Sequence, residues 1–187
     1  MSIATRQILS AFVLASASLL PRAASAAPEV GKPLPDFALR DREGALVSVS
    51  HLAYPGPADP RRPKHVVLLD FFRTDCKPCV ASLPKLVELH KKYGQRGLKV
   101  IMVALHEDDD GAEKLAEFLQ RNPVPFTVLE DPYGVAAGKY VKGPKGVTLP
   151  ALFLGDREGV LRGRWGFVDG TEQRKLGGAI EGYLKSK

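Results

Sequence analysis

Two long apolar runs dominate the hydrophobic pattern of this chain and predict the centre of a β-sheet. Residues 66–72 (VVLLDFF) and 97–105 (GLKVIMVAL) are apolar at most positions, as expected of strands that are buried on both faces. Between them, apolar residues recur at helical spacing from Val80 to Leu89, and Gly94 provides a typical C-terminal stop. Strand, helix and strand in this order predict a βαβ unit.

Shorter periodic segments on either side of this unit predict the rest of the domain. Turn residues at 41–44 (DREG) separate two short extended pieces, which predicts an N-terminal β-hairpin. The closing segment, 171–183, has its apolar residues on one helical face. The other predicted elements are a proline-rich loop at 53–64, a helix at 111–122 capped by Asp110 and Glu113, a strand at 126–129, a short helix ending near Tyr140, a loop at 142–146, and a hairpin of 151–154 with 160–165. This order predicts an α/β domain in which helices flank a mixed central sheet.

The first residues of the chain have the layout of an export signal. Arg6 supplies positive charge, residues 8–20 supply an apolar core, and residues 24–26 (ASA) form a small-residue cleavage site. We expect cleavage after Ala26, which leaves residues 27–187 as one domain in the periplasm or another compartment outside the cytoplasm. An uncleaved membrane anchor is the alternative, although serines interrupt the short apolar core.

The charge of the chain is mildly basic. Its formal charge is +6, and loss of Arg6 and Arg22 with the signal would leave about +4. No dense basic run alternates with aromatic residues, so we expect no nucleic-acid partner. The positive charge favours an acidic partner surface, although solvated lysines explain it equally well.

Two cysteines, Cys76 and Cys79, are the only ones in the chain and follow the first long apolar run. A strand that passes into a helix here places them in the first helical turn, where free backbone N–H groups and the macrodipole favour negative charge. Thiolate is the attacking form in disulfide exchange, so this location makes Cys76 reactive. Pro78 suits the turn, because its fixed φ is helical and it lacks an N–H.

Three interpretations compete for this CxxC pair. A structural zinc site normally takes four ligands, and no second cysteine pair or close histidine pair completes one. A purely structural disulfide would close a very short loop and so restrict the unfolded chain little. A redox-active pair fits the position best. In an exported protein, a pair that works as a reductant has to be reduced again by another protein.

Residues at fixed offsets from the pair resemble the thioredoxin superfamily. Asp70 lies six residues before Cys76, where thioredoxins carry a buried carboxylate that exchanges protons with the second cysteine. Pro84 lies five residues after Cys79, where they carry a proline that kinks the helix. The resemblance implies a thioredoxin-like fold for essentially the whole mature chain.

The resemblance extends to the residues expected to bind substrate. Thr148, Leu149 and Pro150 precede an apolar strand, as the cis-proline loop of the superfamily does. A cis bond before Pro150 would expose backbone edge groups with which an extended substrate can pair. Lys77 and Pro78, between the two cysteines, would border the same substrate groove.

The start of the mature chain resembles the TlpA/ResA branch, the exported thiol:disulfide oxidoreductases. Residues 31–37 (GKPLPDF) match the GxPxPDF opening of that branch, and residues 106–126 have the position of its inserted helix. Some members place a glutamate from this region beside the cysteines, and Glu107 is the residue that matches. The resemblance therefore adds Glu107 to the candidate catalytic residues.

One departure from this branch lies directly before the cysteines. Residues 72–75 (FRTD) replace the usual Trp-Ala-x-Trp, so charge takes the place of aromatic surface beside Cys76. Arg73 and Lys77 should stabilise a thiolate at Cys76, while Asp75 should oppose it.

The resemblance implies an enzyme that needs no cofactor or metal and exchanges its dithiol with protein disulfides. Cys76 would attack as thiolate, and Cys79 would then resolve the mixed disulfide, so the two alternate between dithiol and disulfide. Asp70 would be the general base for Cys79. The implied partners are protein dithiol or disulfide substrates, together with a membrane electron donor upstream. We expect a monomer.

Two rival functions use the same fold. The non-enzymatic alternative is a thioredoxin-fold binding module or a copper chaperone of respiratory-complex assembly. Copper carriers tend to use CxxxC with a distant histidine, or methionine-rich strings, whereas this chain has CxxC and only Met1 and Met102. A peroxidase would need a lone peroxidatic cysteine in a threonine-containing loop, which the sequence lacks. The acidic cluster at 106–110 (HEDDD) could hold a metal, but capping of the following helix explains it without one.

Overall fold

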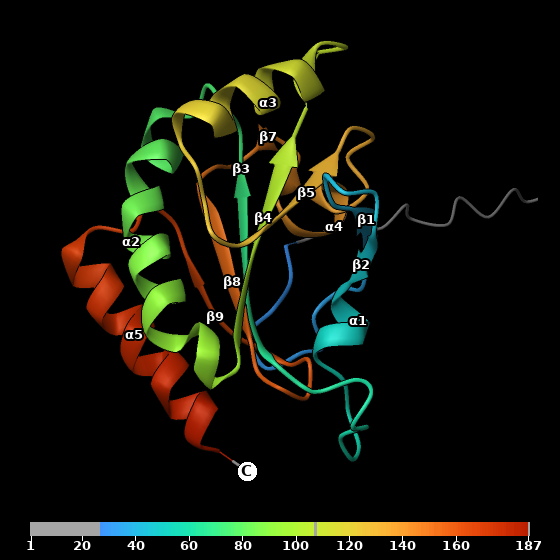
Figure 1. The fold of residues 1–187 in the computed structure, drawn as a ribbon, viewed down its shortest axis with the longest axis vertical. Helices are drawn as coiled ribbons and strands as arrows, with labels where there is room; N and C mark the ends of the chain where they lie inside the picture. The colour runs from blue at the N-terminus through green and yellow to red at the C-terminus, as the bar shows by residue number, and fades with distance from the viewer. Residues whose placement is uncertain (1–26, 107, 187) are drawn as a thin grey trace, which may run out of the picture.

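The sheet at the centre of the fold has the strand order β5-β4-β3-β8-β9 (Figure 1). These elements belong to a computed structural model that describes residues 27–106 and 108–186. β3, β4 and β5 run parallel, whereas β8 is antiparallel to β3 and β9 is antiparallel to β8. The five strands are β3 (Val66–Phe72), β4 (Leu98–Leu105), β5 (Thr127–Asp131), β8 (Ala151–Gly155) and β9 (Leu161–Trp165). The predicted mixed α/β sheet is confirmed.

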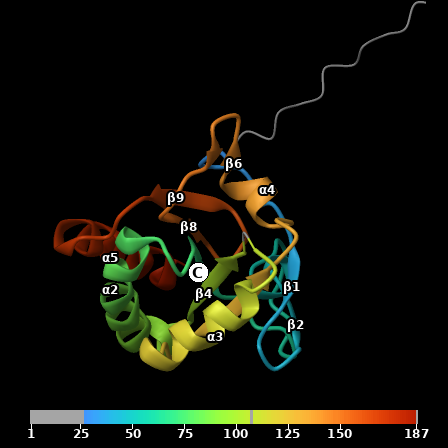
Figure 2. The same ribbon diagram turned by 90° about the horizontal axis from the view of Figure 1, so that it is seen from above.

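Alternation of side chains along β3 divides the core into two layers. Leu68 and Phe72 face one side of the sheet, where they pack with Leu86, Phe118 and Ile180 of three covering helices. These helices are α2 (Lys77–Tyr93), α3 (Gly111–Arg121) and α5 (Gly170–Lys185), and Figure 2 shows them along one side of the sheet. A short 3₁₀ helix, η1 (Gly94–Arg96), follows α2 at the predicted stop.

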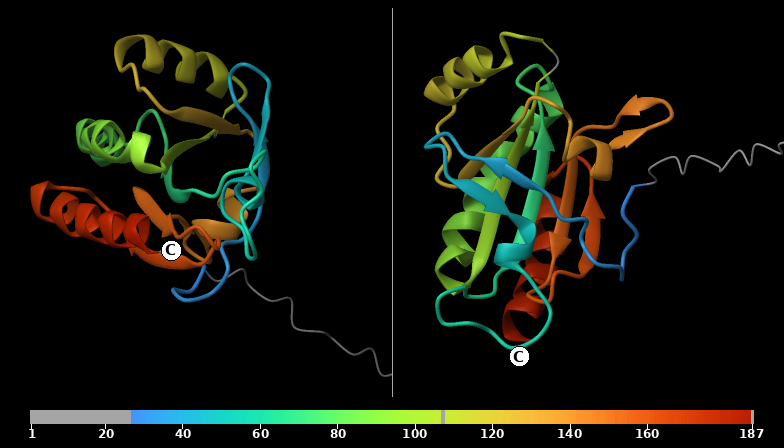
Figure 3. Two further views of the ribbon diagram at one scale, coloured as in Figure 1. Left: turned by 60° about the horizontal axis from the view of Figure 1, so that its bottom comes forward. Right: turned by 90° about the vertical axis from the view of Figure 1, so that its right-hand side faces the viewer.

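The opposite face of the sheet carries an aromatic cluster under the N-terminal part of the chain. Phe71 stacks on Tyr140 with ring centroids 5.0 Å apart, and Phe37 and Phe153 meet Tyr140 edge-on. The elements on this face are β1 (Ala38–Arg40), β2 (Leu46–Ser48), α1 (Val49–Leu52) and α4 (Ala137–Tyr140), as Figure 3 shows. The predicted N-terminal hairpin is therefore present, and it closes the second core layer.

Two local predictions are wrong. The segment predicted as a loop at 142–146 is a small antiparallel hairpin of β6 (Lys142–Gly143) and β7 (Gly146–Val147). Helix α3 does begin after Asp110, but the Asp110 side chain makes no capping hydrogen bond. Its carboxylate lies 2.8 Å from the Lys114 ammonium instead, so the predicted cap of Asp110 with Glu113 is replaced by an ion pair one turn along.

Whether the chain has a membrane-spanning helix was raised by the apolar segment near its start. Within the described ranges, no helix combines the length and apolar character that crossing a bilayer requires. The predicted export signal lies in residues 1–26, outside the described residues.

Candidate active site

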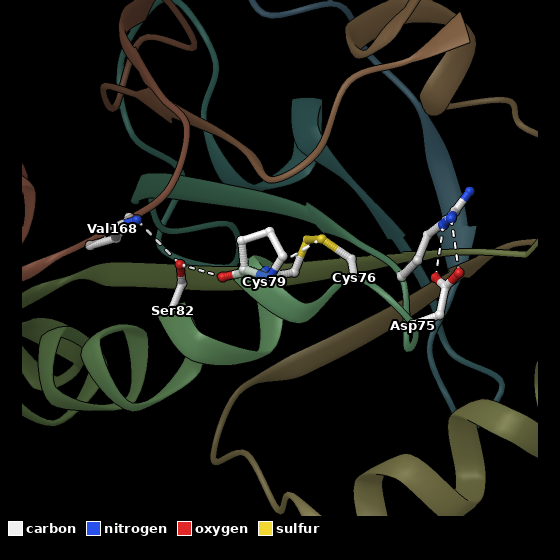
Figure 4. Close-up of a disulfide and its surroundings, with 7 residues drawn as sticks. Asp75, Cys76, Cys79, Ser82 and Val168 are labelled. Atoms are coloured by element: carbon white, nitrogen blue, oxygen red, sulfur yellow. Dashed lines mark hydrogen bonds and ion pairs between the residues drawn. A yellow bond between two sulfur atoms is a disulfide. The ribbon is translucent and has the colours of Figure 1, made fainter.

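The two cysteines lie where β3 ends and α2 begins (Figure 4). Cys76 is the N-cap residue of α2, Lys77 and Pro78 fill the next two positions, and Cys79 completes the first turn. Cys76 thus lies one step before the turn in which it was predicted. The two cysteines are joined by a disulfide, with their Cα atoms 5.3 Å apart.

The two sulfur atoms differ in access to solvent. Cys76 is partly exposed, whereas Cys79 is 1% exposed and packs into the core under α2. The backbone N–H of Cys79 donates to Cys76 Sγ over 3.3 Å. Because the first N–H groups of a helix are otherwise unpaired, this end of α2 favours negative charge on the outer sulfur. The arrangement suits attack by Cys76 and resolution by Cys79.

An ion pair stands directly before the outer cysteine. The Arg73 guanidinium donates twice to the Asp75 carboxylate, over 3.0 and 2.9 Å. The opposing effects that the sequence predicts for these two residues are therefore largely offset within the pair. Lys77, exposed at the first position of α2, remains as the basic side chain closest in sequence to Cys76.

Asp70 is a buried acid in the middle of β3. It is 1% exposed and lies between Met102 of β4 and Leu152 of β8 in the sheet register. Its Oδ2 atom has no hydrogen-bond partner among the described residues. Burial raises its pKa from 3.8 to about 7, because a low-dielectric setting disfavours the ionised form. Asp70 shares its face of the sheet with Leu68, which packs in the same cluster as Cys79.

The Leu149-Pro150 peptide bond is cis, as the resemblance implies. The register pairs Phe71 of β3 with Ala151 of β8. Pro150 therefore lies at the end of the sheet where β3 ends and the cysteines follow. Leu149 packs at the edge of the same core layer as Cys76, while Thr148 is exposed. The structure thus brings the predicted substrate-binding residues to the disulfide's end of the molecule.

Sequence reasoning missed Ser82. This serine is 1% exposed, and its hydroxyl donates to the Pro78 carbonyl over 3.1 Å and accepts from the Val168 N–H over 3.2 Å (Figure 4). Ser82 thereby joins the cysteine turn of α2 to the loop before α5. The one available signal was a polar residue at a buried position of an apolar helical face.

Glu107 lies outside the described residues, so its predicted place beside the cysteines stays a prediction. Of its neighbours, Asp108 pairs with Lys114 over 3.0 Å, and His106 Nε2 lies 3.5 Å from a Glu130 carboxylate oxygen. Among the described residues, no three histidine, cysteine or acidic side chains gather closely enough to hold a metal ion.

Comparison with known proteins identifies the family and several similar proteins. Residues 30–164 match the AhpC/TSA family. The ResA thiol-disulfide oxidoreductase of Geobacillus kaustophilus is 31% identical over 157 residues, which cover 84% of this chain and 77% of the relative. The ResA protein of Bacillus anthracis is 29% identical over the same length, covering 84% and 78%.

A solved structure supports the same fold. A Chlorobium tepidum protein, provisionally assigned as the thiol:disulfide interchange protein DsbE, superposes with a TM-score of 0.67. It is 28% identical, and the match covers 83% of this chain and 98% of that one. The thioredoxin-like fold predicted from the sequence is therefore confirmed.

Proposed function

This chain belongs to the AhpC/TSA family and is a thiol:disulfide oxidoreductase of the ResA-like type, and from that premise we propose that it reduces protein disulfides outside the cytoplasm. The observation that carries the proposal is the unequal access of the two sulfurs, with Cys76 at the helix tip and Cys79 buried behind it. An extracytoplasmic location rests on the export signal predicted in residues 1–26.

The proposed reaction starts from the dithiol form. Cys76 thiolate attacks one sulfur of the substrate disulfide, a Cys76–substrate disulfide forms, and the other substrate sulfur leaves with the electron pair. Cys79 then attacks Cys76 Sγ, which releases the second substrate thiolate and gives the Cys76–Cys79 disulfide. The substrate gains two electrons, and the enzyme loses two.

Asp70 is the general base that we propose for Cys79 in the resolving step. Cys79 must lose a proton before it attacks, and a buried carboxyl with a pKa of about 7 exchanges protons at neutral pH. The shared face of the sheet supports this role for Asp70. Glu107 remains a second candidate acid, on the resemblance alone.

The reductive direction requires an electron donor, for which we propose a membrane protein that reduces the disulfide again. A reduction potential for the Cys76/Cys79 couple near that of thioredoxin, about −270 mV, fits a reductant. A value near that of DsbA, about −120 mV, would instead make the protein an oxidant.

Trapping tests the roles of the two cysteines. The Cys79→Ser variant, mixed in reduced form with disulfide-bonded insulin, should accumulate a mixed disulfide through Cys76, visible by non-reducing electrophoresis and peptide mass. The matched Cys76→Ser variant should accumulate none. If only that second variant trapped substrate, the roles would be reversed. If neither variant trapped it and the wild type left insulin oxidised, the proposed enzyme function would be lost.

A further inference from the structure

An ordered hairpin stands directly before the cis-proline loop and contributes nothing to the core. All residues from 142 to 148 are exposed, and β6 and β7 extend outward from the body of the fold (Figures 2 and 3). Val147 leaves 41% of its surface exposed. Isolated two-stranded hairpins are only marginally stable in water. The fold thus holds an exposed ribbon where a substrate must approach.

Residues 142–144 of the hairpin line one groove of the surface. This groove has a volume of about 640 Å³, and Thr148 and Pro150 of the cis-proline loop are among the residues that line it. Tyr140 and Phe153, which are each 1% exposed, are also among its lining residues, as is Trp165 of the edge strand β9. Because Pro150 also borders the cysteine end of the sheet, a polypeptide that pairs with the cis-proline loop can continue into the groove.

The charge of the groove has one sign. Lys142 and Arg164 line it, Lys145 lies in the turn of the hairpin, and no acidic side chain is among the lining residues. Within the described part of the chain, none of these three forms an ion pair, whereas Lys114 and Arg162 each have an acidic partner. The Arg164 guanidinium lies 5.3 Å from the centroid of the Phe153 ring, and it donates to the Pro28 carbonyl over 3.4 Å. Cations without an acidic partner, beside apolar lining residues, are complementary to an acidic chain with apolar side chains.

We propose that the β6–β7 hairpin and this groove dock an acidic, extended segment of the substrate protein, next to the disulfide that Cys76 attacks. The inference rests on the proposed function and adds a substrate class to it. The occupant is a partner polypeptide with glutamate or aspartate within a few residues of its reactive cysteine. Pro144 and Gly146, whose φ is +99°, favour the turn of the hairpin, so less conformational entropy is lost when the partner binds.

Two activated peptides test the substrate class. They share one sequence around a single cysteine, flanked by two glutamates in one peptide and two lysines in the other. Each cysteine is supplied as a mixed disulfide with thionitrobenzoate. When Cys76 of the reduced protein attacks the peptide sulfur, coloured thionitrobenzoate leaves with the electron pair, and Cys79 then releases the peptide thiol. Rates with 2-mercaptoethanol, a small thiol with no charge other than that of its reactive thiolate, correct for the intrinsic reactivity of each peptide.

At low ionic strength, the corrected kcat/KM should favour the glutamate peptide by about three- to tenfold, the range expected for two exposed ion pairs. Salt should reduce this preference, because charges on the surface are screened over about 10 Å at 0.1 M ionic strength. The Lys142→Glu/Lys145→Glu variant should lose or reverse the preference. The Arg42→Glu/Arg61→Glu variant changes the net charge equally at exposed positions outside the groove and should keep it.

The outcomes separate this inference from the proposed function. If both peptides react equally fast, or if both charge-reversal variants behave alike, the docking inference is wrong although the enzyme is active. Equal rates would exclude an acidic segment as the occupant and leave others, such as the N-terminal segment, of which Ala27 lines the groove. A dimer in the wild type that the Lys142→Glu/Lys145→Glu variant cannot form would assign it to a second copy. If neither peptide releases thionitrobenzoate faster with the reduced protein than without it, the proposed function itself fails.

Discussion

The burial of Asp70 predicts a pH-dependent loss of stability that one substitution should remove. In the folded protein, burial raises the pKa of this carboxyl to about 7, from 3.8 for an aspartate exposed to water. Between these two values the folded state keeps its proton while the unfolded state gives it up. Folding stability therefore falls as pH rises from about 4 to about 7, and the loss is complete above the folded pKa.

The magnitude follows from the pKa shift. At 1.36 kcal/mol for each pH unit, a shift of about three units corresponds to about 4 kcal/mol. A loss of that size is a substantial fraction of the 5–15 kcal/mol by which domains are typically stable, so it should be easy to measure. Asp70→Asn replaces the acid by an amide of similar shape that does not titrate. Its own burial adds an offset that is the same at every pH.

The assay is urea unfolding of the oxidised wild type and Asp70→Asn, measured in steps from pH 4 to pH 8. In the oxidised form the cysteines do not titrate, and all other groups are common to both proteins. Relative to the variant, the wild type should lose about 4 kcal/mol of unfolding free energy over this range, with most of the change below pH 7. A difference that stays constant across the range would refute the reasoning, because it would mean that Asp70 titrates alike in both states.

Three further predictions concern polar groups near the site and its scaffold. Ser82→Ala leaves the buried Val168 N–H without its acceptor, and it should cost about 1–3 kcal/mol in urea unfolding and speed hydrogen exchange at that amide, while Ser82→Thr should restore protection. Asp131 is as buried as Asp70 but accepts two backbone N–H groups, so Asp131→Asn should destabilise the protein by about 2 kcal/mol at pH 7, and a stabilised variant would contradict this. Asp75→Asn removes the negative charge next to Cys76 and the ion pair that it forms with Arg73. Alkylation of the reduced protein by iodoacetamide below pH 7 should then be about two- to fivefold faster in low salt, and an unchanged rate would contradict an effect of Asp75 on the Cys76 thiolate.

The sequence predicts the elements whose physics is local. Residues 66–72 are apolar at nearly every position because both faces of β3 are buried, and that composition can be recognised without a partner strand. The turn at 41–44 and the stop at Gly94 carry their own chemistry and are also predicted correctly. The cis bond at Pro150 came from the resemblance, since few X-Pro bonds are cis and no local signal marks this one.

The features that the sequence did not predict depend on distant or ambiguous partners. Ser82 is joined to Val168, 86 residues away, and nothing near it in the chain indicates that contact. The β6–β7 hairpin has two-residue strands, which are too short to show a period. Asp110 precedes a helix, where capping is a sound expectation, but Lys114 one turn later competes for the same carboxylate.

The reduction potential distinguishes the effect of Asp70 on folding stability from its proposed role in the reaction. Reduction of the disulfide creates thiols that ionise on the same side of the sheet as Asp70, and two negative charges there would oppose each other. The number of protons taken up with the two electrons then depends on Asp70, and each proton changes the slope of potential against pH by about 30 mV per unit. The slopes of the wild type and Asp70→Asn should therefore diverge around pH 7. If the two slopes coincide while the stability curves differ as predicted, Asp70 lowers the folding stability of the protein but has no part in the resolving step.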